Sequence, residues 1–218
     1  MLSGSGLEIG ALHEPAVVPG DARVRYFDAM NERDAAALFR EIPPERFVKV
    51  DFVGDLDSDG LGQFQDGSFD FVVINHVLEH VANPVKAVRE VFRICRKGGI
   101  VIIAIPDKEF TFDRGRELTS WEHLWADYIN DTRVSDDAHY ESFLRSAAPH
   151  VFKEPPENLR IHIQLSRKRR EHAHVWNSGS FEEFLLNCFG SLNIAADMRL
   201  KSVAPENQIE YFSVWEKR

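Results

Sequence analysis

The chain has 218 residues, a length that one domain usually takes. Hydrophobic residues make up 44% of it, with 16 Phe and 4 Trp, which is enough for a sizeable core and argues against overall disorder. The formal charge of −9 argues against a general affinity for nucleic acid, because phosphate binding needs a basic surface.

Compartment and redox state follow from three further observations. The sequence has no basic, apolar leader at its start and no apolar run of about 18 residues, so we expect a cytoplasmic protein with no membrane partner. Its two cysteines, Cys95 and Cys188, fall in apolar patterns of helical spacing. We therefore expect reduced, buried thiols and neither a disulfide nor a zinc site.

The first quarter of the chain predicts three short strands and one helix. Residues 7–10 form a strand that ends in a glycine turn, and residues 24–28 form the next. The connection over 11–23 carries two prolines, which disfavour a helix, so we expect an irregular loop. Asn31 is a good N-cap for a helix to Glu41, and residues 47–51 predict the third strand.

The middle of the chain predicts a βαβ unit. An apolar strand from Phe69 ends in the polar pair Asn75-His76, and Asn83-Pro84 supplies a cap and first-turn proline for a helix that Gly98 ends. Residues 100–105 are unbroken and apolar, as in a central strand buried on both faces. Such a unit offers a ligand crevice at the carboxyl ends of its strands.

The remainder predicts helices over the crevice and two closing strands. Residues 108–174 show amphipathic helical patterns rich in aromatic residues. Ser180 and Glu183 have capping-box spacing and predict the start of another helix. Residues 192–200 and 209–215 read as a pair of strands at the edge of the sheet.

Several of these motifs carry a family resemblance. Leu7-Glu-Ile-Gly10, Leu78-Glu-His80 and Lys97-Gly-Gly99 before an apolar strand resemble class I S-adenosylmethionine (SAM) dependent methyltransferases, from Leu7 to about Pro106. Ile105-Pro-Asp-Lys108 adds a likeness to small bacterial methyltransferases of sugars and secondary metabolites. The resemblance implies an α/β fold of the Rossmann-like, doubly wound kind: a mostly parallel seven-stranded sheet with an antiparallel C-terminal edge. It implies one domain over 1–218, with 108–175 as a helical lid insertion.

The cofactor site is expected at the ends of the first strands. Dinucleotides are disfavoured because Gly10 stands alone, without the Gly-x-Gly-x-x-Gly turn that cradles a pyrophosphate. SAM has no phosphate, and Gly10 allows a close backbone approach. The resemblance implies that Glu8 holds the ammonium group and that Asp28, 20 residues further on, binds the ribose diol. It further assigns Asp51, or Asp55 with Leu56, to the adenine and Asn75 and His76 to the sulfonium end. Taken singly, each acid is equally consistent with a turn or capping role.

A base is needed if the acceptor is a hydroxyl, because methyl transfer is a direct displacement in which the protein mainly positions the reactants. His76 and Asp107 follow the fourth and fifth strands and are the first candidates, then His174. His172 and His174 have strand spacing that puts both rings on one side, but no carboxylate or cysteine lies at a useful spacing, so no metal is expected.

Two other polar groups have competing interpretations. Glu79-His80 is expected to start a helix or pack rather than to catalyse. The basic run over 167–170 would bind a phosphate or carboxylate of the acceptor, or else form a solvated helix end.

The resulting hypothesis is SAM-dependent methyl transfer to a small-molecule acceptor, a hydroxyl oxygen of a sugar or natural product, with no nucleic-acid partner. One alternative is a methyltransferase-fold protein without activity that serves in binding or regulation. Another is a different SAM-using or nucleotide-binding enzyme on the same scaffold, such as a decarboxylase or cyclase. No oligomeric state is predicted.

Overall fold

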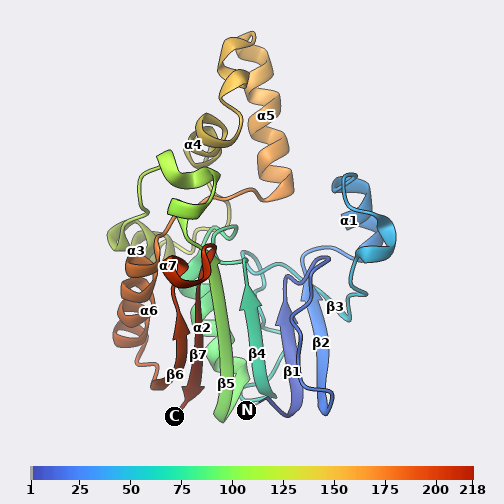
Figure 1. Ribbon diagram of the computed structural model, residues 1–218, viewed down its shortest axis with the longest axis vertical. Coiled ribbons are helices and arrows are strands. Elements are labelled where there is room, and N and C mark those ends of the chain that lie inside the picture. The colour runs from blue at the N-terminus through green and yellow to red at the C-terminus, as the bar shows by residue number, and fades with distance from the viewer. Residues whose placement is uncertain (1) are drawn as a thin grey trace.

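The computed structural model describes residues 2–218, and in this range seven strands form one sheet in the order β3-β2-β1-β4-β5-β7-β6 (Figure 1). The strands are β1 (Gly4–Ile9), β2 (Ala22–Asp28), β3 (Phe52–Val53), β4 (Phe69–Asn75), β5 (Cys95–Pro106), β6 (Ala196–Ser202) and β7 (Glu210–Lys217). Strands β1 to β5 pair in parallel, whereas β7 is antiparallel to both β5 and β6. The predicted Rossmann-like sheet with an antiparallel C-terminal edge is therefore confirmed.

The helices gather on one face of the sheet and above its upper end. The α-helices are α1 (Glu32–Leu38), α2 (Pro84–Ile94), α3 (Trp121–Ile129), α4 (Asp137–Ala147), α5 (Pro156–Arg169), α6 (Ser178–Leu192) and α7 (Ala204–Asn207). Short 3-10 turns are η1 (Pro44–Arg46), η2 (Lys108–Phe110), η3 (Phe112–Gly115) and η4 (Pro149–Lys153). Helices α2 and α6 share the main core with the inward side chains of the strands. No described helix over 2–218 combines the length and apolar character needed to cross a bilayer.

Helix α2 starts as predicted but ends earlier. The Asn83 side chain accepts a hydrogen bond from the Lys86 amide at 3.0 Å, and Pro84 occupies the first turn. The helix ends at Ile94, because Cys95 is already extended and pairs with the first residue of β4. The helical placement of Cys95 was therefore wrong, although the residue is buried with a free thiol.

The β1–β2 connection is irregular, as the prolines predict. Gly10 turns the chain with a φ of +70°, and no helix forms between residues 10 and 21 of the described chain. Ala16 and Val18 pack against the second face of the sheet, beside the buried side chains of Phe71 and Val73. The segment thus lies over a sheet face and leaves the upper rim of the sheet open.

Several other boundaries differ from the sequence prediction, since α1 ends at Leu38 rather than Glu41 and β6 begins at Ala196 rather than at residue 192. The third strand comprises Phe52–Val53 rather than 47–51, because only these residues pair with the end of β2, and Asp51 precedes the strand. Helix α6 begins after Asn177, which forms a capping box with Ser180, so Ser180 occupies the third helical position and is not the cap.

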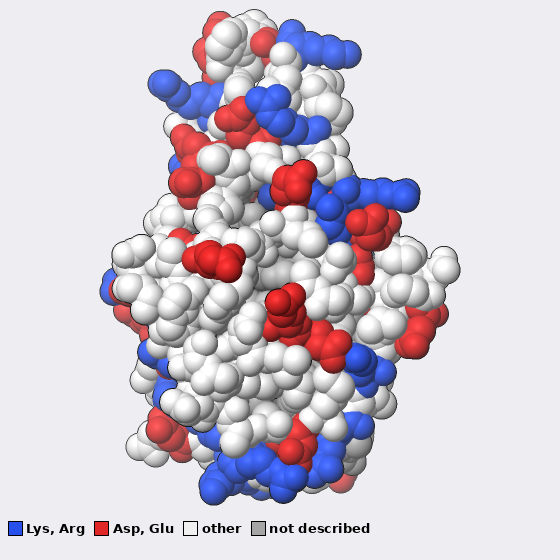
Figure 2. Space-filling model, turned by 90° about the vertical axis from the view of Figure 1, so that its left-hand side faces the viewer, with Lys and Arg blue, Asp and Glu red and all other residues white. Residues whose placement is uncertain are grey.

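Helices α4 and α5 stand above the carboxyl ends of the strands, whereas α3 lies beside α6 and contacts α2 (Figure 1). A small core of their own holds α4 and α5 together, formed by Tyr140, Phe143, Leu144 and Ile163. We call residues 108–175 the lid, and their treatment as an insertion in one domain stays a prediction. On the face that Figure 2 shows, Lys and Arg gather at the end of the molecule opposite the lid and lie on the lid as well.

Candidate functional site

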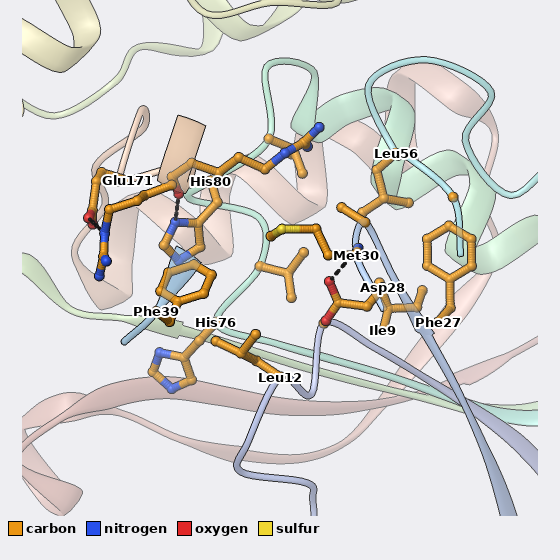
Figure 3. Close-up of a pocket in the computed structure, with 17 residues that line it drawn as sticks. Ile9, Leu12, Phe27, Asp28, Met30, Phe39, Leu56, His76, His80 and Glu171 are labelled. Carbon is orange, nitrogen blue, oxygen red and sulfur yellow. Dashed lines mark hydrogen bonds and ion pairs between the residues drawn. The ribbon is translucent and has the colours of Figure 1, made fainter. Parts of the chain in front are cut away.

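A cavity opens where strands β1 to β4 end beneath the lid (Figure 3). It holds about 800 Å³ of space, which includes open solvent at its mouth. Its walls are mostly apolar, with a few polar groups directed inward. Residues from each neighbouring strand end and from the lid line it, among them Gly10, Asp28, Met30, Leu56, His76 and Arg170.

Gly10 forms part of the cavity floor at the end of β1. Its φ of +70° lies in the left-handed region, where a side chain is strained. A Cβ at this position would come within 2.4 Å of Val77 Cγ2. Only glycine fits here without displacing a neighbour, so its exposed backbone is open to a ligand.

Asp28 is the last residue of β2, and its carboxylate points into the cavity beside Met30 and Leu12 (Figure 3). The Met30 amide donates a long hydrogen bond of 3.4 Å to Oδ1. Burial raises the pKa of Asp28, while backbone hydrogen bonds and the charge of Arg170 oppose the rise. A carboxylate has about four acceptor sites, so some acceptor capacity remains for a ligand.

Glu8 does not line the cavity. It lies lower on β1, and its Oε1 accepts a hydrogen bond of 2.8 Å from the Ala16 amide in the proline-bearing segment. Its Oε2 is buried without a hydrogen-bond partner among residues 2–218. Burial raises the pKa of Glu8, and the bond from Ala16 counteracts part of that rise.

The predicted adenine-side residues separate in the structure. Leu56 lines the cavity, whereas Asp55 and Asp51 do not. Asp55 forms an ion pair with Arg170 of the lid. Asp51 accepts a hydrogen bond of 2.8 Å from the Tyr26 amide, below the rim, because β3 begins only after it.

His76 and Asn75 end β4, but only His76 lines the cavity. The His76 ring turns from the cavity toward β7, where Nε2 lies 2.6 Å from Glu210 Oε2 (Figure 3). Burial disfavours its protonation, but the Glu210 hydrogen bond and the charges of nearby carboxylates outweigh this and raise the pKa of His76. The Asn75 Oδ1 atom is buried and has no partner in the described part of the chain.

A buried polar cluster lies behind the cavity. Glu79 is 2% exposed, and neither of its carboxyl oxygens has a partner among the described residues. Burial raises its pKa, with the charges of His172 and His76 acting in the other direction. His80, which lines the cavity, lies 3.6 Å from Glu79 through its Nε2, and burial lowers its pKa to about 3.

Asp107 and His174 lie outside the cavity. Asp107 Oδ2 accepts two hydrogen bonds of 2.7 Å from Ser178, and Oδ1 accepts a third from the Glu109 amide at 3.0 Å. His174 is 1% exposed and faces His123 and His139. Burial and these two rings lower its pKa well below the usual range. The catalytic roles of Asp107 and His174 stay predictions.

The spacing of His172 and His174 predicted that both rings lie on one side of a strand, and this prediction was wrong. Residues 171–177 form no strand, and the His172 Nδ1 atom lies 2.5 Å from Asp113 Oδ2, next to the His80 ring. His174 belongs to a different group of histidines.

The basic run also has a function that local reasoning missed. Helix α5 ends at Arg169, and Arg170 follows with a left-handed φ of 52°. Arg169 pairs with Glu41, while Arg170 pairs with Asp55 and lies 3.3 Å from Asp57. Both arginines line the cavity, so they join the lid to its rim. No local signal could have found these partners, since Arg170 and Asp55 are 115 positions apart.

Comparison with known proteins adds the following. Residues 3–103 match the sequence model of a methyltransferase domain family. The uncharacterized protein MJ1123 of Methanocaldococcus jannaschii is 34% identical over 107 residues, which cover 49% of this chain and 46% of that protein. The chain therefore matches less than half the length of this relative.

Solved structures share the fold at low sequence identity. A putative Zn-dependent alcohol dehydrogenase from Rhodobacter sphaeroides aligns with a TM-score of 0.56 at 13% identity, covering 99% of this chain and 84% of that one. A SAM-dependent methyltransferase from Thermotoga maritima, described as a possible histamine N-methyltransferase, has a TM-score of 0.47 at 18% identity, covering 100% and 83%. At such identities the likeness concerns the fold alone.

Proposed function

Because residues 3–103 match the sequence model of a methyltransferase domain family, we propose that the cavity binds SAM and that the protein methylates a small polar acceptor. One observation carries this proposal. Gly10 and Asp28, at the ends of neighbouring strands, line the same cavity. A backbone without a Cβ and a carboxylate with spare acceptor capacity thus meet at an apolar pocket.

The residues present fit the cofactor. Asp28 would accept hydrogen bonds from the ribose hydroxyls, and Leu56 and Met30 would contact the adenine from the apolar wall. The unpartnered Oε2 of Glu8 supports its predicted contact to the ammonium group through water. When bound, SAM supplies an electrophilic methyl group on a sulfonium centre.

The protein's own contribution is position and proton transfer. Arg169 and Arg170 hold the end of the lid over the cavity through pairs to Glu41 and Asp55, which would restrict water. His76 is the proposed base for a hydroxyl acceptor, since it lines the cavity at the end of β4. Its ring, which Glu210 holds at 2.6 Å, would have to turn back toward the acceptor. A hydroxyl oxygen of a sugar or secondary metabolite is the acceptor that this arrangement favours.

Calorimetry with SAM and S-adenosylhomocysteine tests the cofactor site. We expect micromolar binding by the natural sequence and none by an Asp28→Ala variant. Asp59→Asn is the matched control, because Asp59 is an exposed aspartate outside the cavity. Absence of heat at millimolar ligand would remove the proposed cofactor.

Mass spectrometry tests the transfer. Sugars and phenols incubated with SAM should gain the mass of one methyl group, and a His76→Ala variant should lose most of this rate. Full activity of that variant would exclude His76 as the base. SAM binding without transfer to any of the hydroxyl compounds would instead favour the binding or regulatory alternative.

A further inference from the structure

The lid brings together three histidines that are far apart in the sequence. His123 lies in α3, His139 lies in α4, and His174 lies in the segment that follows α5. Each offers one ring nitrogen, and these three atoms lie within 4.8 Å of one another. We propose that His123, His139 and His174 form a binding site for a divalent transition-metal ion of the zinc class.

The strongest sign is the state of His174. Its side chain is 1% exposed, and neither ring nitrogen has a hydrogen-bond partner within residues 2–218. A buried polar group without a partner is costly, and native proteins rarely keep one without a ligand, water or ion. The rings of His123 and His139 lie against it, with centroids 5.8 and 5.3 Å away. A shared ion would supply the missing partner.

The other two histidines already have the geometry of ligands. The Nε2 atoms of His123 and His139 lie 3.1 Å apart. Two nitrogens bound to one zinc ion at the usual ~2.0–2.1 Å lie about 3.3 Å apart in tetrahedral geometry, so little movement is needed. Asp136 Oδ1 lies 2.7 Å from Nδ1 of His139 and leaves Nε2 for the ion, the usual arrangement around a metal-bound histidine.

Local charge favours a cation at this position. Asp127 Oδ2 lies 3.2 Å from the His123 Nε2 atom and Asp136 stands behind His139, so two carboxylates border the three rings. Arg116 donates to the His139 carbonyl, but its charge is balanced by Asp113 at 2.7 Å. Imidazole donors select zinc and its transition-metal neighbours over magnesium and calcium, which prefer oxygen.

The site also leaves room for a fourth ligand. His123, His139 and Asp136 border an open cleft of about 780 Å³, which includes open solvent, and the His123 side chain is 43% exposed. Three histidines plus an open position is the pattern of reactive zinc sites, in which water or a substrate oxygen completes the coordination. The expectation of no metal rested on spacing along the chain, which does not show that α3 and α4 supply two further rings.

Metal titration of the purified chain tests the proposal without reference to methyl transfer. After removal of metal with a chelator, Zn²⁺ should bind at one ion per chain. His123→Gln and His139→Gln should weaken binding by more than the roughly 10–100-fold that an outer partner costs, and Asp136→Asn should weaken it by about that amount. Co²⁺ should give a tetrahedral visible spectrum that His123→Gln abolishes.

His162→Gln is the matched control, because His162 is a half-buried lid histidine paired with Glu154 outside the cluster. It should bind Zn²⁺ like the natural sequence, and circular dichroism should show that all variants are folded. Failure of the natural sequence to bind Zn²⁺ stoichiometrically would overturn the proposal. Equal affinity in every variant, or a loss confined to His172→Gln, would also overturn it, the latter by placing the ion at Glu79, His80 and His172.

Discussion

Replacing Arg116 by methionine should strongly destabilise the lid. The side chain is 3% exposed, and its guanidinium donates to five acceptors. These are Asp113 Oδ1 at 2.7 Å, the His172 carbonyl at 3.0 Å, Ser142 Oγ at 3.1 Å, the Ala173 carbonyl at 3.2 Å and the His139 carbonyl at 3.4 Å. Methionine keeps much of the volume but removes the cation that pairs with the buried Asp113 carboxylate and the donor to several carbonyls.

Removing one member of a buried ion pair costs about 3–5 kcal/mol. His172 still contacts Asp113 at 2.5 Å, so we expect the lower end of that range, a loss of about 3 kcal/mol in the free energy of unfolding. Urea denaturation followed by circular dichroism measures it. Arg114→Met is the control, because Arg114 is 76% exposed and its loss should change stability by less than about 0.5 kcal/mol.

A double-mutant cycle with Asp113→Leu makes the test sharper. Replacing both partners by apolar side chains should recover part of the loss, since no isolated charge then remains buried. A loss below about 1 kcal/mol for Arg116→Met, with no coupling to Asp113, would refute the view that this pair braces the lid.

Three further predictions concern the cavity and the residues around it. Gly10→Ala should lower the free energy of unfolding by about 1–2 kcal/mol, because the residue has a left-handed φ. It should also weaken SAM binding in calorimetry, because the added Cβ displaces Val77, and unchanged SAM affinity would place the cofactor elsewhere. Glu210→Gln should lower the raised pKa of His76 in an NMR titration of its ring protons, and an unmoved pKa would contradict the hydrogen-bond assignment. Burial raises the pKa of Asp57 from 3.8 to about 6, so the folded state binds its proton more tightly than the unfolded chain. The stability of the natural sequence relative to Asp57→Asn should therefore fall as the pH rises from about 4 to about 6, whereas a constant difference in urea unfolding would show that Asp57 does not titrate in this way.

Local signals predicted the parts of the fold that local chemistry decides. Asn83 and Pro84 mark the start of α2 because a side-chain cap and a proline act within one turn. The start of α6 was misplaced because Asn177 and Ser180 both suit a cap. Asn177 takes that place through two reciprocal hydrogen bonds, of 2.8 and 3.0 Å, with Ser180.

The cavity was only partly predictable, because local signals mark strand ends but not the contacts between distant segments. Gly10, Asp28, Leu56 and His76 follow strand ends, and strand ends in a parallel sheet meet at one rim. The lid arginines and the three-histidine group depend on how α3, α4 and α5 pack onto that rim. Such contacts span tens of positions, so no local spacing encodes them. Asp51 was predicted to end the third strand but precedes it, because the backbone pairing of two residues decides where β3 begins.

The second face of the sheet, which coil rather than helix covers, has a consequence for local unfolding. Among residues 2–218, the buried cluster on that face consists of Phe71, Val73, Ile100 and Val214. Strand β2 lies second from one edge of the sheet, next to the two-residue β3, whereas β4 and β5 are central. Among the parallel strands, we expect the backbone amides of β2 to exchange with solvent deuterium first. Local unfolding of this edge, which carries Asp28, would then precede global unfolding.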